Sequence, residues 1–127
     1  MRERVLASTI GAALLLGMAA IPAAARDGRD ARGGCSGGHS EWRLSVQREE
    51  AGLLRVRFRI EGSEGGHEWQ LFVSNQGKRI YAGTKLSDDG GEVRLRLATR
   101  DRRGRDHIAA TGVDLTTGES CSGGLRV

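Results

Sequence analysis

Hydrophobic and polar residues alternate one by one along most of this chain after residue 40. Around residue 57, for example, Leu54, Val56, Phe58 and Ile60 are separated from one another by single arginines. In an extended strand, this alternation places apolar side chains on one face and polar side chains on the other. The pattern therefore predicts half-buried β-strands, and no segment shows a convincing helical period.

Seven antiparallel strands are predicted, four of them directly from this alternation and one, over 78–86, as a weaker strand through Ile80, Tyr81 and Ala82. Turn sequences rich in glycine, aspartate and asparagine separate them, as Asp88-Asp89-Gly90-Gly91 does. The predicted strands lie near 42–47, 54–60, 69–74, 78–86, 93–98 and 107–115, with a last one that ends near Cys121.

Seven short strands in about 90 residues are typical of an immunoglobulin-like sandwich of two sheets. The two apolar faces would then enclose one core that holds Trp42, Phe58 and Trp69. A small barrel of five or six strands is the alternative, because alternation alone does not determine topology. We therefore predict an all-β fold with the sandwich as the leading architecture.

The first 25 residues have the layout of a secretory signal peptide. A short basic start is followed by an apolar run over 5–21, then by Pro22 and three alanines that suit signal peptidase. The run is interrupted and too short to favour a transmembrane anchor. We predict a signal peptide over 1–25, a secreted extracellular product, and no membrane span after removal of the signal.

The remainder of the chain divides into two parts by composition. Residues 26–40 contain almost no apolar side chain and many glycines, so they are predicted to be a flexible lead-in. Residues 41–127 carry the alternating pattern and are predicted to form the sandwich domain.

The chain has two cysteines, Cys35 and Cys121. In an oxidising compartment, two cysteines pair by default in one disulfide. Neither cysteine has a CxxC spacing or a histidine cluster nearby, which disfavours a catalytic thiol or a metal site. We predict a disulfide that closes a loop of about 85 residues, worth roughly 4 kcal/mol in the chain-entropy treatment.

A resemblance extends over about residues 35–123. It rests on Cys35-Ser-Gly, on Trp42 in the first predicted strand and Trp69 in the third, and on the segment Thr117-Gly118-Glu119-Ser120-Cys121. This frame resembles a group of small secreted proteins of actinobacteria that have immunoglobulin-like sandwiches, one terminal disulfide and no assigned function. The resemblance implies the fold and the disulfide, and it implies no activity.

Sequence motifs of enzymes are absent. The chain contains neither a Gly-x-Ser-x-Gly elbow nor a phosphate-binding glycine loop. The three histidines, His39, His67 and His107, show no ligand spacing between any two of them. We therefore predict no catalytic residue, no metal site and no cofactor, and a protein that is not an enzyme.

Arginines gather on the polar faces of the predicted strands. Three alternate with the apolar residues of the second strand, two with those of the fifth, and one lies in the first. In an immunoglobulin-type sandwich these three strands belong to one sheet. The candidate anion-binding face consists of Arg43, Arg55, Arg57, Arg59, Arg94 and Arg96.

Two interpretations of this face stay open. Arginines also serve as a solvated outer surface that deters aggregation, and Glu41, Glu61 and Glu92 flank them. The functional interpretation is a secreted, non-enzymatic binding module for an anionic cell-envelope polymer or an acidic protein. Nucleic acid is disfavoured, because the few aromatic residues are mostly predicted in the core and only Phe72 faces outward.

A second function of a different class is a small secreted protease inhibitor or another loop-based effector. It would act through the glycine-containing loops at 62–66 and 102–104.

Overall fold

The computed structural model describes residues 28–101 and 106–127. A short 3-10 turn, η1 (Glu50–Gly52), joins the second and third of the strands in these ranges. The strands are β2 (Gly28–Gly34), β3 (Glu41–Glu49), β4 (Leu53–Glu61), β5 (Glu68–Asn75), β6 (Lys78–Leu86), β7 (Val93–Arg100), β8 (His107–Asp114) and β9 (Ser120–Arg126).

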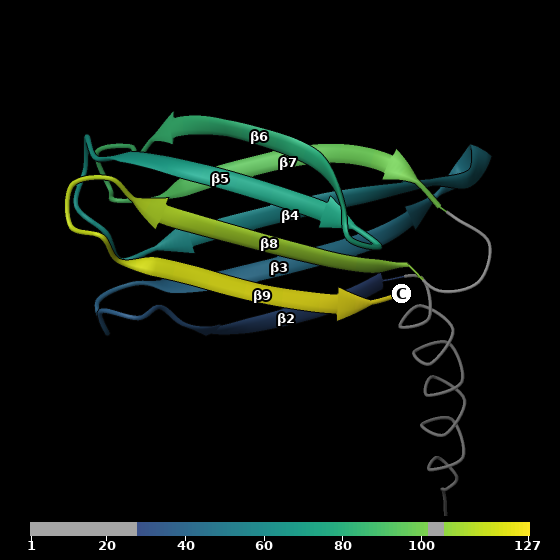
Figure 1. The fold of residues 1–127 in the computed structure, drawn as a ribbon, viewed down its shortest axis with the longest axis horizontal. Helices are drawn as coiled ribbons and strands as arrows, with labels where there is room; N and C mark the ends of the chain where they lie inside the picture. Colours follow the sequence, from purple (N-terminus) through teal and green to yellow (C-terminus); the bar gives the residue numbers. More distant parts are fainter. Residues whose placement is uncertain (1–27, 102–105) are drawn as a thin grey trace, which may run out of the picture.

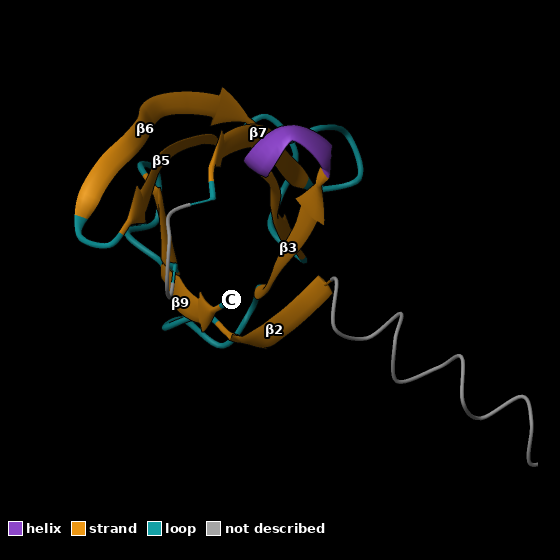
Figure 2. Cartoon of the chain, turned by 90° about the vertical axis from the view of Figure 1, so that its right-hand side faces the viewer, coloured by secondary structure: helices purple, strands orange, loops and turns teal. Residues whose placement is uncertain are grey.

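These strands form two antiparallel sheets of four strands each. One sheet has the order β2-β3-β4-β7, and the other has the order β6-β5-β8-β9. The sheets lie face to face as two layers (Figures 1 and 2) and do not close into a barrel. The all-β sandwich predicted from the alternating pattern is confirmed.

Apolar residues that alternate with polar ones in the sequence alternate between buried and exposed positions in the structure. In β4, all four apolar residues from Leu54 to Ile60 are buried, while the arginines between them lie on the outer face. Trp69, Leu71 and Val73 of β5 meet them from the opposite sheet as part of one hydrophobic cluster. The predicted core is therefore confirmed, with Trp42, Phe58 and Trp69 all inside it.

Strand β2 lies within the segment that the sequence predicts to be a flexible lead-in. Gly28–Gly34 pairs along its whole length with β3, from Gly28 opposite Gln47 to Gly34 opposite Glu41. Backbone pairing to β3 requires no apolar side chain, so a hydrophobic pattern cannot detect this strand. The predicted count of seven strands is corrected to eight in the described ranges.

The last strand also differs from its prediction. It was expected to end near Cys121, but β9 begins at Ser120 and continues to Arg126. Its alternation is hidden because Gly123 occupies an inward position, where a Cβ atom would overlap the Trp42 ring. The indole therefore fills the space that a larger side chain of β9 would otherwise take.

The sheet order brings β3, β4 and β7 together as neighbours, which the arginine prediction requires. Strand β6 pairs with β5 in the opposite sheet instead of lying beside β7. The order thus departs from the constant-type immunoglobulin arrangement while keeping the sandwich architecture.

The disulfide joins the two sheets at one edge. Cys35 directly follows β2 and Cys121 lies in β9, and their sulfur atoms are 2.11 Å apart. Strands β2 and β9 are edge strands of different sheets and lie side by side in both views (Figures 1 and 2). The predicted pairing is confirmed. In the described ranges, no helix is long and apolar enough to cross a membrane.

Candidate functional site

The structure places all six predicted arginines on the outer face of the β2-β3-β4-β7 sheet, which we call the arginine face. Direct cross-strand pairing aligns one arginine from each strand across the whole sheet. This arginine row consists of Arg32, Arg43, Arg59 and Arg94. Arg32 of β2 was not predicted, because its strand was not recognised in the sequence.

The remaining predicted arginines lie in the neighbouring positions of the same face. Arg57 of β4 stands directly opposite Arg96 of β7. Arg55 stands opposite Ala98 and forms an ion pair of 3.1 Å with Glu49, so it lies apart from the like-charged pairs. The sheet therefore brings five of the predicted arginines into opposed pairs and leaves Arg55 at the margin.

Carboxylates neutralise one end of the arginine row. Glu61 lies 2.9 Å from Arg59, and Glu92 contacts both Arg59 and Arg94 at 3.1 and 3.0 Å. The hydrogen bond from Arg94 is the main reason that the pKa of Glu92 is lowered, and the same bond raises the pKa of Arg94. The predicted flanking role of these two glutamates is thus confirmed.

Four other arginines of the face are not neutralised. Arg32, Arg43, Arg57 and Arg96 are exposed, and no carboxylate of the described residues forms an ion pair with any of them. A hollow of about 120 Å³ opens between the arginine row and Glu41. The face is therefore cationic, exposed and shallow, with one of these four arginines on each of its four strands.

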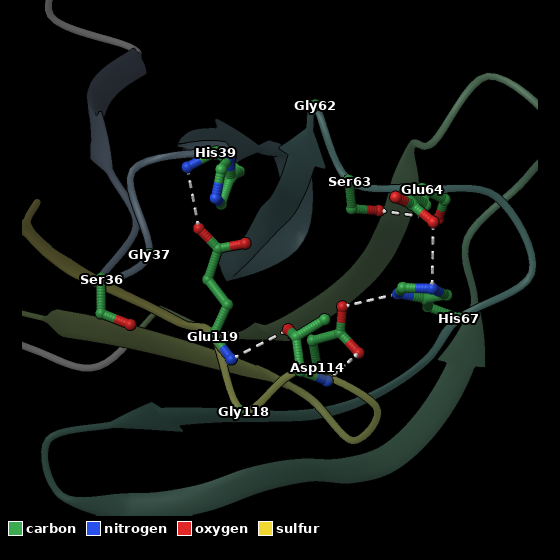
Figure 3. A pocket seen from close by; sticks show the side chains of 11 residues that line it. Ser36, Gly37, His39, Gly62, Ser63, Glu64, His67, Asp114, Gly118 and Glu119 are labelled. Carbon is green, nitrogen blue, oxygen red and sulfur yellow. Dashed lines mark hydrogen bonds and ion pairs between the residues drawn. The ribbon is translucent and has the colours of Figure 1, made fainter.

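A second region, which the sequence did not predict, lies at the disulfide end of the sandwich. Here the turn after β2, the loop after β4 and the turn after β8 enclose a pocket of about 550 Å³, which we call the terminal pocket (Figure 3). It is lined by Ser36, Gly37, His39, Gly62, Ser63, Glu64, His67, Asp114, Thr117, Gly118 and Glu119.

His67 and Asp114 form the central contact of the terminal pocket. The Nδ1 atom of His67 lies 2.8 Å from Oδ2 of Asp114, and Figure 3 shows the ring between Asp114 and Glu64. The other oxygen of Asp114 accepts hydrogen bonds from the backbone amides of Thr116 and Thr117. Burial would raise the pKa of Asp114, but the bonds from His67 and these amides outweigh it and lower the pKa.

Glu119 is the second buried carboxylate of the pocket. It accepts hydrogen bonds from the Ser40 hydroxyl at 3.0 Å and from the amides of His39 and Ser40 at 3.2 Å each. Burial would raise its pKa, but these hydrogen bonds outweigh burial and lower it. Glu119 thereby ties the turn after β2 to the turn that precedes β9.

The side chains of the terminal pocket mainly hold its loops together, because its buried carboxylates are already hydrogen-bonded to loop residues. An ionised aspartate can only accept, so Nδ1 of His67 donates to Asp114, while Nε2 of the ring lies 3.7 Å from the Glu64 carboxylate. Both Asp114 and Glu119 are fully engaged with the chain. Within 28–101 and 106–127, no group of three His, Cys, Asp or Glu residues is arranged to hold a metal ion.

No pattern in the sequence indicates this pocket, since its key contacts are long-range. His67 and Asp114 are 47 positions apart, and Ser40 and Glu119 are 79 apart. Only the sheet pairing and the disulfide bring them together. Residue spacing cannot report such contacts.

Two other predicted features have different outcomes. Phe72 points outward as predicted and is half-buried, because the guanidinium of Arg79 lies over its ring, 4.4 Å from the centroid.

The loop at 102–104 proposed for an inhibitor lies outside the described residues. The loop at 62–66 is held by backbone hydrogen bonds to Ser87 and Gly91, and an inhibitory role for it stays a prediction.

This chain matches no known family, no curated protein and no solved structure. The resemblance to small secreted proteins of actinobacteria therefore stays a prediction.

Proposed function

We propose that the chain is an exported, non-enzymatic binding module that holds an anionic partner on its arginine face. The observation that carries this proposal is the set of four exposed arginines without a carboxylate partner among the described residues, in which Arg32 stands opposite Arg43 and Arg57 stands opposite Arg96. Opposed like charges destabilise a sheet by about 0.2–1 kcal/mol per pair. An anion bound between them replaces repulsion with charge-assisted hydrogen bonds.

The chemistry of arginine supports this role. A guanidinium group stays charged at every physiological pH and presents a planar set of donors that fits carboxylates and phosphates. The four exposed arginines without a carboxylate partner offer these donors to a ligand. The shallow shape of the face suits a polymer or an extended acidic segment better than a small substrate that needs a closed pocket.

The proposed location follows from the disulfide and the leader. A structural disulfide across a small domain is typical of proteins in oxidising compartments. Together with the signal peptide predicted over 1–25, it supports secretion. The partners that fit both location and charge are anionic envelope polymers and acidic extracellular proteins.

A charge reversal tests the proposal. We expect the oxidised wild-type domain to be retained on envelope fractions at low salt and released at high salt, because exposed charge contacts are screened. Arg43→Glu combined with Arg57→Glu should abolish retention without lowering the folded fraction. The matched control is Lys78→Glu with Arg126→Glu, which makes the same charge change on exposed positions of the opposite sheet.

Retention of the Arg43/Arg57 variant at the wild-type level would refute the arginine face as the site. If the control variant lost retention to the same degree, the loss would be due to the change in net charge and not to the arginine face. Absence of wild-type retention on every anionic fraction would refute the proposed function itself.

A further inference from the structure

The outer face of the β6-β5-β8-β9 sheet, which we call the uncharged face, contrasts with the arginine face. The apolar residues of β5 from Trp69 to Val73 point into the core, so the residues that alternate with them point outward. The outward positions of β5 form four rows across the sheet, and the side chains paired across the two middle rows are uncharged. In these rows Gln70 stands between Thr84 and Val113, and Phe72 stands between Ala82 and Thr111.

The end of the uncharged face beside the terminal pocket carries protruding leucines around a carboxylate. Leu86 stands opposite Glu68 on β6. On the other side, the amide of Leu115 donates a hydrogen bond to the carbonyl of Glu68. The two leucines are 67% and 52% exposed, so both leave a large apolar side chain in water. This end therefore presents apolar projections and one negative charge.

The opposite end of the uncharged face carries a hollow and a positive charge. The hollow has a volume of about 460 Å³, and Phe72, Ser74, Arg79 and Ala109 contribute to its lining. Arg79 stands opposite Ser74, in the fourth outward row. Neither Arg79 nor Glu68 forms an ion pair with another of the described residues. The two ends of the face thus differ in both shape and charge.

These ends complement each other when a second copy of the chain lies face to face with the first. A two-fold axis in the plane of contact, perpendicular to the strands, places each end of one copy over the opposite end of the other. If the axis passes between the two middle rows, Glu68 lies over the row of Ser74, one strand away from Arg79. Leu115 then lies over the end of β8 where Ala109 borders the hollow. The symmetry repeats each contact, so each complementary pair is formed twice.

Charge disfavours the other two-fold arrangement of the same two faces. An axis parallel to the strands would place the two ends that carry Glu68 together and the two ends that carry Arg79 together. Like charges brought together at an interface oppose association strongly. The perpendicular axis instead brings opposite charges together at both ends.

The size of the uncharged face is sufficient for a dimer. Four strands about 4.8 Å apart and four outward rows about 6.7 Å apart give a footprint of about 500 Å² for each copy. Two copies then bury about 1,000 Å², which is the lower limit for a specific interface. Small outward side chains such as Ala82 and Ala109 allow the two sheets to approach to the usual distance of about 10 Å.

We infer that two copies of this chain associate through their uncharged faces as a two-fold dimer, with each strand of β5 lying antiparallel to its partner across the contact. The leucine end of each copy covers the hollow of the other, and Glu68 pairs with Arg79 across the interface. The arginine face lies on the other sheet, so the dimer presents two arginine faces on its outer sides. This inference does not depend on what the arginine face binds.

Sedimentation velocity of the oxidised mature protein at increasing concentration measures the association. We expect monomer and dimer in reversible equilibrium, because an interface of this size is at the weak end of the range. Leu115→Asn should raise the dissociation constant at least about tenfold, since it removes an apolar contact from both halves of the interface. The matched control is Leu53→Asn, which changes an exposed leucine of the other sheet and should leave the dissociation constant unchanged.

Charge reversal tests the direction of the dimer. Glu68→Arg and Arg79→Glu should each raise the dissociation constant at least about tenfold, because like charges then meet at both ends. A chain that carries both substitutions should dimerise like the wild type, since the pair is restored with its signs exchanged. The arrangement with equal ends together would give no such recovery.

A mixture of the two single variants guards against effects on folding. Glu68→Arg and Arg79→Glu should be largely monomeric when each is alone, and their mixture should form a heterodimer in which both charge pairs are complementary. A wild-type protein that stays monomeric at every concentration would overturn the inference. A dimer that persists unchanged in Leu115→Asn and Glu68→Arg would assign association to another surface. Absence of recovery in the double variant would overturn the two-fold arrangement.

Discussion

The arginine face and the terminal pocket use charged side chains in opposite ways. In the terminal pocket, Asp114 and Glu119 are only 2% and 8% exposed, and each accepts three or more hydrogen bonds from the chain. On the arginine face, like charges stand opposite one another in water, and four of them have no carboxylate partner in the described ranges. The first arrangement stabilises the fold, whereas the second opposes it.

Desolvation explains why the two regions differ. A buried carboxylate without partners would be very unfavourable, so a folded chain keeps one only where donors surround it. An exposed guanidinium stays hydrated, and its repulsion from a neighbour is screened. The terminal pocket therefore belongs to the structural framework, and the arginine face is free to serve a ligand.

Removal of the disulfide at the pocket end has the largest expected effect. Cys35→Ser with Cys121→Ser should lower the free energy of unfolding by about 2–5 kcal/mol, because the closed loop spans most of the domain. Urea unfolding measured by tryptophan fluorescence checks this, with the reduced wild-type protein as a matched comparison. A variant as stable as the oxidised wild type would contradict a stabilising bridge.

Loss of a buried carboxylate has the next largest effect. Asp114→Ala leaves the amides of Thr116 and Thr117 and the ring of His67 without their acceptor and should lower stability by about 1–3 kcal/mol.

The same residue gives a pH dependence with a defined sign. The folded-state pKa values of Asp114 and Glu119 lie below their ordinary values of 3.8 and 4.5, so folding favours the ionised forms. Their stabilisation is complete above these ordinary values and is lost as the pH falls through the lowered ones. Unfolding measured as a function of pH should therefore show a loss of stability below about 4.5 that is smaller in Asp114→Ala. An acid loss as large as that of the wild type would show that Asp114 does not contribute to it.

The smallest expected effect has the opposite sign. Arg43→Gln removes the charge that stands between Arg32 and Arg59 and should raise the free energy of unfolding by about 0.2–1 kcal/mol for each relieved pair. Thermal unfolding at low salt measures this gain, which should shrink at high salt because screening weakens the repulsion. Arg126→Gln on β9 is the control and should bring no gain. Destabilisation by Arg43→Gln would indicate that the arginine stem packs on the sheet more than its charge repels.

The sequence was most informative where each strand carries its own apolar face. The positions of β3, β4, β5 and β7 follow from alternation, because burial of one strand face leaves a local trace of period two. β2 left no such trace, since it is held by backbone bonds to β3 and has small or polar side chains. Because β2 was not predicted, Arg32 was not predicted as the fourth member of the arginine row either.

Properties that individual residues carry can be predicted from the chain alone. These are the strand pattern, the core residues, the pairing of the two available cysteines and the outward direction of the arginines. Which side chains meet across large separations depends instead on how the strands pair and pack. Cross-strand register aligned the four arginines into a row, and the closure of the sandwich brought Asp114 to His67 and Glu119 to Ser40. Register and closure depend on the whole set of contacts between strands, and no local window of sequence contains that set.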